Sequence, residues 1–292
     1  SFPLVLAGGI APSLNPEPLA EFMDLIALGE GEEILAPLVE AIREGKAPSR
    51  EKSAVLERML ALEGVYVPSF SRPSYSADGR LDHIAVQPPA PRRVSRAWVR
   101  DLDRHPAMSR IVPPGSAFKN LSLLEVNPGC GRGCRFCAAG HLCRPLRHHS
   151  LASLKSTVEE GSATLARFGL LGSAVADHPD VVELARSIVD RGWKFSVSSL
   201  RLDRLNPELL QLLYRGGCRT VTIAPETGSE RLRWSVNKRI KDDRILEAGF
   251  FNRISKFFKC VHTAGFSVVK LGIEIFFSRL LFFGSSVKID GE

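Results

Sequence analysis

The chain has 292 residues, of which 44% are hydrophobic and 24% charged, so its composition is that of an ordinary globular protein and excludes a disordered chain. Its formal net charge is +7, but lysines and arginines are spread along the sequence, so a nucleic-acid partner is not favoured. No apolar run reaches the roughly 18 residues of a membrane span and no signal peptide is visible, so we expect a cytoplasmic protein without a membrane partner.

The first 46 residues alternate between short strands and helices. A strand over 4–7 is expected to end at a glycine pair, and a helix over 15–23 follows with Asn15 as its N-cap. Residues 24–46 predict a second strand and an amphipathic helix. The apolar face of that helix consists of Ile34, Leu35, Leu38, Val39 and Ile42. This β-α-β-α pattern predicts the end of a doubly wound sheet, and we expect the chain to begin inside a larger protein.

Residues 48–120 are expected to form an irregular connection, because prolines interrupt their strand-like pieces. Strands and helices then alternate regularly. The expected strands are 122–128, 168–175, 194–200, 220–226 and 267–275. The expected helices are roughly 151–167, 180–191, 207–215 and 240–264. Repeated β/α units predict a parallel sheet, either a barrel or an open doubly wound sheet, and both place their chemistry at the carboxyl ends of the strands.

Three of the six cysteines lie in one short loop directly after the first of these strands. Cys130, Cys134 and Cys137 have a C-x3-C-x2-C spacing, and the glycines between them permit tight turns. Arg132 and Arg135 bring positive charge that favours thiolates over thiols. Three thiolates suit three irons of a cubane cluster and leave the fourth iron open.

The cysteine spacing also allows a zinc ion, an electron-transfer cluster or a disulfide. A structural zinc site needs four ligands, and His141 or Cys143 could supply the fourth. An electron-transfer cluster also needs a fourth cysteine, for which Cys143 is the nearby candidate. A disulfide with a free thiol would be unusual in a reducing compartment.

The motif Cys130-x3-Cys134-x2-Cys137, with Phe136 before the last cysteine, resembles the cluster loop of the radical S-adenosylmethionine superfamily. The resemblance implies a [4Fe-4S] cluster, S-adenosylmethionine bound at its open iron, and an electron donor such as flavodoxin or ferredoxin. Reductive cleavage of S-adenosylmethionine would yield a 5′-deoxyadenosyl radical for C–H functionalisation or methylation of an unknown substrate. The alternatives are methylthio transfer to tRNA or protein, and a non-catalytic zinc or iron–sulfur module.

The N-terminal residues narrow the resemblance. Residues 1–47, with their glycine pair and the sequence GEGEE at 29–33, resemble the C-terminal end of a Rossmann-like cobalamin-binding domain. The implied fold is therefore α/β, with this remnant joined through 48–120 to a partial TIM-like radical barrel over 121–275. The tail at 276–292 replaces a further β/α unit, so an incomplete barrel is expected. Cobalamin would bind only to the full-length protein.

The same resemblance places cofactor contacts near the strand ends. The candidates are Phe136, Gly172, Ser173, Ser199, Arg201 and Glu226. Phe136 would lie near the adenine, and the turn at Gly172 and Ser173 would meet the methionine amino group. Arg201 would pair with the carboxylate or with a surface acid, and Glu226 would contact the ribose or cap a helix. Gly172 could instead serve close packing alone.

Four further residues receive structural roles. Asp177 is expected to cap the helix that Pro179 begins, although a substrate contact is the alternative. The pair His148-His149 is expected in a solvated loop, and Cys218 is expected to be a buried apolar residue. Asn237 and Lys238 are further candidate contacts for the cofactor.

Overall fold

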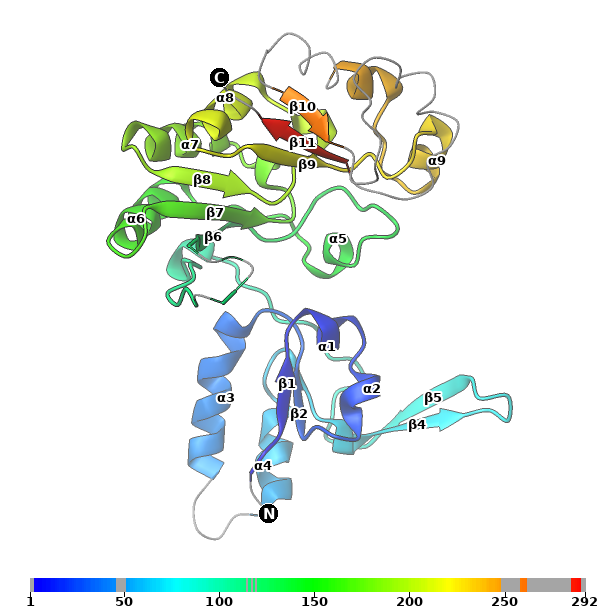
Figure 1. Cartoon of the computed structure of the whole chain (residues 1–292). Coiled ribbons are helices and arrows are strands. Elements are labelled where there is room, and N and C mark those ends of the chain that lie inside the picture. Colours follow the sequence, from blue (N-terminus) through cyan, green and yellow to red (C-terminus); the bar gives the residue numbers. More distant parts are fainter. Residues whose placement is uncertain are drawn as a thin grey trace. The chain divides into compact units, whose positions relative to one another are not determined.

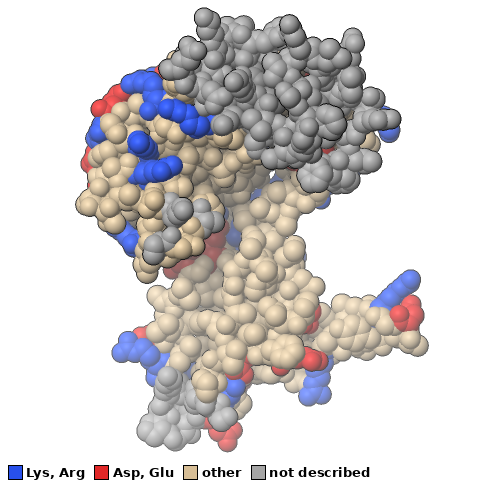
Figure 2. All heavy atoms as spheres, viewed as in Figure 1, with Lys and Arg blue, Asp and Glu red and all other residues tan. Residues whose placement is uncertain are grey.

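The computed structural model describes most of the chain, and the described residues form two compact units (Figure 1). The described ranges are 3–45, 51–113, 115–116, 118, 120–247, 258–261 and 285–289. The units are Ser1–Asp101 and Leu102–Glu292. Within the described ranges, no helix is both long and apolar enough to cross a membrane. On the face drawn in Figure 2, basic side chains stand in several separate places with acidic ones near many of them.

The first unit is built on a three-stranded sheet of order β1-β2-β3. Strand β1 (Leu6–Gly8) is parallel to β2 (Leu25–Ala27), which is antiparallel to β3 (Val65–Tyr66). The helices of this unit are α1 (Ile10–Leu14), α2 (Glu17–Ala20), α3 (Gly31–Gly45) and α4 (Lys52–Met59). Buried side chains from the sheet, α3 and α4 form one core, so the β-α-β-α reading is confirmed in outline.

Two local expectations for this unit are wrong. The helix expected over 15–23 is shorter, because α2 covers only Glu17–Ala20 and its N-cap is Pro16, although Asn15 Oδ1 does accept a hydrogen bond from the Glu17 amide at 3.2 Å. The apolar face of α3 is narrower than expected. Ile34 and Leu38 are buried in the core, whereas Leu35 and Val39 are 52% and 51% exposed. The helix therefore packs along a single i, i+4 row.

The stretch expected to be an irregular connection is partly regular. It contributes α4 and β3 to the first unit, and a hairpin of β4 (Ser71–Tyr75) and β5 (Leu81–Val86) follows. Val55, Leu56 and Met59 are the buried positions of α4, at the spacing of one helical face. That spacing was the signal for a helix at this place.

The second unit has the predicted parallel β/α order. Strands β6 (Ser122–Asn127), β7 (Arg167–Gly172) and β8 (Lys194–Val197) form a parallel sheet. Strand β9 (Thr220–Ile223) lies beside the end of β8, where the Leu200 amide donates to the Thr222 carbonyl at 2.9 Å. The connecting helices are α6 (Leu151–Ser162), α7 (Val181–Asp190) and α8 (Pro207–Arg215). Their apolar faces share one core with the strands, which confirms the α/β class.

The last described strands depart from the predicted pattern. Strand β11 (Ser285–Ile289) lies between β9 and β10 (Phe258–Val261) and is antiparallel to both. The helix expected over 240–264 is therefore wrong at β10, which is a strand. The expected strand over 267–275 lies outside the described residues.

Candidate functional site

The cysteine loop leaves the sheet at the carboxyl end of β6, the functional edge of a parallel sheet. Cys130 and Cys134 are buried, Cys137 is partly buried, and all three thiols are free. Gly129 and Gly133 have φ values of 80° and 70°, which side chains rarely adopt. The loop can therefore turn sharply enough to keep its cysteines inside.

A second segment holds this loop from the side of α9 (Glu230–Ser235). The Arg135 amide donates to the Val236 carbonyl at 2.9 Å, and its guanidinium donates to the Ser235 carbonyl at 2.6 Å. Asn237 Nδ2 donates to the Gly133 carbonyl at 2.7 Å. Three hydrogen bonds thus fix the cysteine loop against the residues that end α9.

The donor set of the loop fits an iron–sulfur cluster, which takes one cysteine on each of several irons. The Gly140 amide, at the start of α5 (Ala139–Leu142), donates to Cys137 Sγ at 3.3 Å, and hydrogen bonds to the ligand sulfurs tune such clusters. His141 Nε2 lies 3.1 Å from the Cys134 carbonyl oxygen. Among the described residues no three His, Cys, Asp or Glu side chains form a group that could hold a single metal ion.

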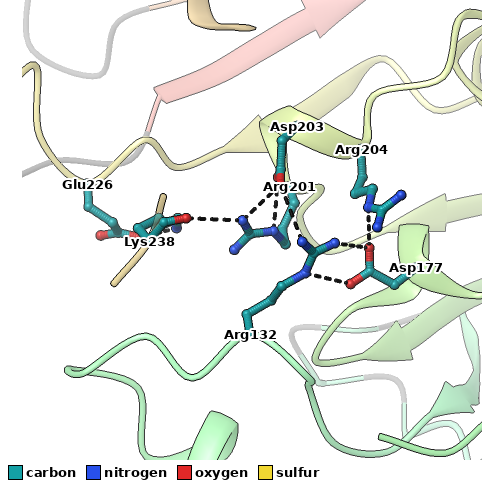
Figure 3. Close-up of polar contacts among 7 residues, drawn as sticks. All are labelled: Arg132, Asp177, Arg201, Asp203, Arg204, Glu226 and Lys238. Atoms are coloured by element: carbon teal, nitrogen blue, oxygen red, sulfur yellow. Dashed lines mark hydrogen bonds and ion pairs between the residues drawn. The ribbon is translucent and has the colours of Figure 1, made fainter. Parts of the chain in front are cut away.

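An ion-pair network joins the cysteine loop to the ends of β7 and β8 (Figure 3). Arg132 Nε and Nη2 donate to the two carboxylate oxygens of Asp177, at 3.1 and 2.8 Å. Arg204 Nε lies 3.0 Å from Asp177 Oδ1, and Arg132 Nη1 lies 3.6 Å from Asp203. The hydrogen bonds that Arg132 donates to Asp177 are the largest cause that raises the pKa of Arg132, and the negative charges of Asp177 and Asp203 add to it.

The position of Asp177 corrects its expected role as a helix cap. It ends a short 3-10 turn, η3 (Val175–Asp177), and α7 begins at Val181 after Asp180 as its N-cap. The carboxylate is instead drawn to two guanidinium groups, which offer it stronger hydrogen bonds than a helix amide would.

Arg201 forms an ion pair with a neighbour, as one of its two sequence readings allowed. Its Nε and Nη2 donate to Asp203 at 2.9 and 3.1 Å, and Nη2 also donates to the Lys238 carbonyl at 3.3 Å. Burial opposes ionisation of Asp203, but the hydrogen bonds and charge of Arg201 outweigh it and lower the pKa of Asp203. Ser199, two residues earlier, is exposed.

Lys238 brings two of the predicted contact residues together. Its Nζ donates to Glu226 Oε1 at 2.6 Å and lies 5.8 Å from the ring centroid of Phe136. The Lys238 side chain is largely buried, and Glu226 has a φ of 73° that turns the chain after β9. Phe136 itself is exposed, so its ring is open to a further stacking partner.

Gly172 packs against Asn127, a residue that sequence reasoning missed. A Cβ on Gly172 would lie 2.1 Å from Asn127 Oδ1, so the close-packing role proposed for this glycine is present. Asn127 is fully buried, donates from Nδ2 to the Ala174 carbonyl at 2.7 Å, and has no partner for Oδ1 among the described residues. Ser173 is exposed. The sequence signal that could have identified Asn127 was a polar residue at the end of an apolar strand.

The adjacent histidines are not in a solvated loop, which corrects that expectation. His149 is 2% exposed, and its backbone amide pairs with the Val126 carbonyl beside β6. His178 Nε2 lies 2.9 Å from the His149 carbonyl oxygen, and its ring packs edge-on against His148 at 5.0 Å. Burial lowers the pKa of His149. Cys218 is buried, as predicted.

Two family descriptions match the sequence. Residues 1–68 match "Radical SAM proteins, N-terminal", and residues 124–263 match "Radical SAM superfamily". The second range begins within β6 and contains the cysteine loop and β7 to β9. These ranges agree with the two stretches in which the sequence resemblance was found.

Similar curated proteins come from archaea. An uncharacterized protein of Methanocaldococcus jannaschii is 31% identical over 249 residues, covering 84% of this chain and 48% of the relative. An uncharacterized methyltransferase of Pyrococcus horikoshii is 22% identical over 262 residues, covering 84% of this chain and 50% of the relative. The chain thus spans about half the length of the curated relatives that it matches.

The fold is similar to that of solved structures of TsrM from Kitasatospora setae, a radical S-adenosylmethionine methyltransferase. The structure with cobalamin and a [4Fe-4S] cluster has a TM-score of 0.58 at 20% identity, covering 86% of this chain and 49% of that one. The structure with tryptophan and aza-SAM has a TM-score of 0.54 at 19% identity, with coverage of 86% and 48%.

Proposed function

The chain belongs to the radical S-adenosylmethionine superfamily, and from this premise we propose that Cys130, Cys134 and Cys137 hold a [4Fe-4S] cluster for S-adenosylmethionine chemistry. One observation carries the proposal. Three free cysteines, two of them buried, lie in one tightly turned loop at the carboxyl end of the first parallel strand. The Gly140 amide adds support, because it donates a hydrogen bond to Cys137 Sγ of the kind that cluster sulfurs accept.

The cluster, when bound, supplies the electron that cleaves S-adenosylmethionine to a 5′-deoxyadenosyl radical. The chain's own residues provide binding and shielding. Two of the three thiolates are kept from water by their burial, and Asn237 and Arg135 hold the loop that carries them. We expect the reducing electron to come from a carrier such as flavodoxin or ferredoxin, in a reducing cytoplasm.

The remaining predicted contacts are assigned by the same proposal. Phe136 offers an exposed ring for the adenine, and Glu226 with Lys238 offers polar groups for the ribose. Gly172 and Ser173 would receive the amino group at the end of β7. Arg201 could bind the S-adenosylmethionine carboxylate only while its guanidinium is shared with Asp203. Ser199, two residues earlier, is exposed.

Methylation is the reaction that we favour for the full-length protein. A curated relative is named a methyltransferase, and the similar solved structure is a radical methyltransferase with cobalamin bound. Because this chain spans about half of each, we place cobalamin binding in the full-length protein only. The proposal leaves the substrate open.

Anaerobic reconstitution with iron and sulfide tests the cluster. We expect about four irons per chain, and a paramagnetic spectrum of the reduced protein that changes when S-adenosylmethionine is added. Cys130→Ser, Cys134→Ser and Cys137→Ser should each lose most of the iron. Cys218→Ser, a buried cysteine away from the loop, is the matched control and should retain it.

Two results would contradict the proposal. One is a chain that takes up about one zinc ion and no sulfide. The other is a cluster whose iron content depends on Cys143 as strongly as on the three proposed ligands, because a fourth cysteine would leave no open iron for S-adenosylmethionine. The iron content of Cys143→Ser tests the second result.

A further inference from the structure

Arg132 occupies a special place in the cysteine loop, between the first two proposed ligands. Its guanidinium leaves the loop and meets the carboxylate of Asp177 through two hydrogen bonds, at 3.1 and 2.8 Å (Figure 3). Two guanidinium nitrogens of Arg132 each donate to a different carboxylate oxygen of Asp177, which is the geometry of the strongest ion pairs in proteins. The cysteine loop is thereby joined to the turn that follows β7.

This ion pair is shielded from water. The Asp177 side chain is 8% exposed and the Arg132 side chain 26%, so the charges interact with less screening than a surface pair would. In a partly buried site, each charge interacts with other charges several ångströms away.

The network carries more positive than negative charge. Its members are Arg132, Arg201, Arg204, Asp177 and Asp203, which bring three positive charges against two negative ones. Asp177 is shared by Arg132 and Arg204, so it offsets the charge of the arginine that stands between Cys130 and Cys134 in the sequence. Without Asp177, the acidic partner left to Arg132 among the described residues would be Asp203 at 3.6 Å.

We propose that the Arg132–Asp177 ion pair tunes the reduction potential of the cluster by controlling the charge that Arg132 brings to the cysteine loop. This inference rests on the proposed function. One-electron reduction adds a negative charge to the cluster. A nearby positive charge without a partner therefore favours the reduced form, and removal of that positive charge disfavours it. Asp177 is thus a positioning residue that acts through Arg132 and moderates its charge.

The test is an anaerobic redox titration of the reconstituted protein, followed by the paramagnetic spectrum of the reduced cluster. We expect Asp177→Asn to shift the midpoint to a less negative potential and Arg132→Gln to shift it to a more negative one. The double variant Arg132→Gln/Asp177→Asn should fall between them, near the parent protein. Asp177→Glu keeps the charge and should titrate like the parent.

Asp190→Asn is the matched control, because Asp190 also pairs with an arginine, Arg215, but on the exposed surface at 3.5 Å. It should leave the midpoint unchanged. Shifts of the same sign in Asp177→Asn and Arg132→Gln, or no shift at full iron and sulfide content, would overturn the inference. So would loss of the cluster in both Asp177→Asn and Asp177→Glu, which would assign the pair a purely structural role. A parent protein that takes up no cluster would instead refute the proposed function, and the inference with it.

Discussion

Substitution of Gly129 by alanine should damage the cysteine loop in a way that the structure allows us to quantify. The new Cβ would lie 2.1 Å from the carbonyl oxygen of Cys143 and 2.8 Å from that of Pro145. Both are backbone atoms, so neither can rotate away as a side chain would. Overpacking of this kind costs about 1–3 kcal/mol, and the φ of 80° costs an alanine about 1 kcal/mol more.

Gly192→Ala separates these two costs. Gly192 has a φ of 74°, and a Cβ there meets nothing within 4 Å, so only the backbone penalty of about 1 kcal/mol should apply. Both glycines belong to the second unit. With a urea dependence of about 2 kcal/mol per molar, the midpoint should fall by about 1–2 M for Gly129→Ala and about 0.5 M for Gly192→Ala.

Urea unfolding followed by far-ultraviolet circular dichroism measures this difference, and iron uptake after reconstitution gives a second reading. The Gly129 variant should bind less iron under conditions in which it is still folded, because its cysteines can no longer take their places. Equal midpoints for the two variants would refute the close contact between Gly129 and the Cys143 carbonyl, and with it the reason for a glycine at this position.

Three further predictions follow from buried polar groups. Burial lowers the pKa of His149 below 6.5, so the unfolded chain binds the proton more readily and stability should be lost as the pH falls through this range. Between about pH 7.5 and pH 5.5 the melting temperature should fall more in the parent protein than in His149→Gln. An equal fall in both proteins would contradict this prediction. Arg233 is 0% exposed and donates to the Ile240 and Thr227 carbonyls at 2.6 and 2.9 Å, so Arg233→Met should cost about 2–4 kcal/mol in urea unfolding, whereas exposed Arg231→Met should cost almost nothing. Asn127→Leu removes an oxygen buried without a partner, and the melting temperature should not fall; a clear fall would show that its amide bond outweighs this cost.

Much of the second unit could be predicted from the sequence because its signals are local. Alternation of apolar strands with amphipathic helices reflects backbone geometry, and α8 begins and ends where the pattern indicates, at Pro207 and Arg215. The three cysteines and their spacing identify the candidate ligands without any coordinates. The sequence prediction missed α4, although its buried positions share one helical face, and it assigned the residues of β10 to a helix.

The partners of the charged and buried polar residues were decided by the tertiary structure. Arg132 and Asp177 are 45 positions apart, and Asn237 meets Gly133 across 104, so no local pattern records these pairs. His149 is buried because its segment lies beside β6, and Asn127 is enclosed because Gly172 leaves it room. The sequence alone determined which residues could hold a cluster. Only the packing of distant segments decided which charges and hydrogen bonds surround them, because such contacts depend on where the sheet brings its strand ends together.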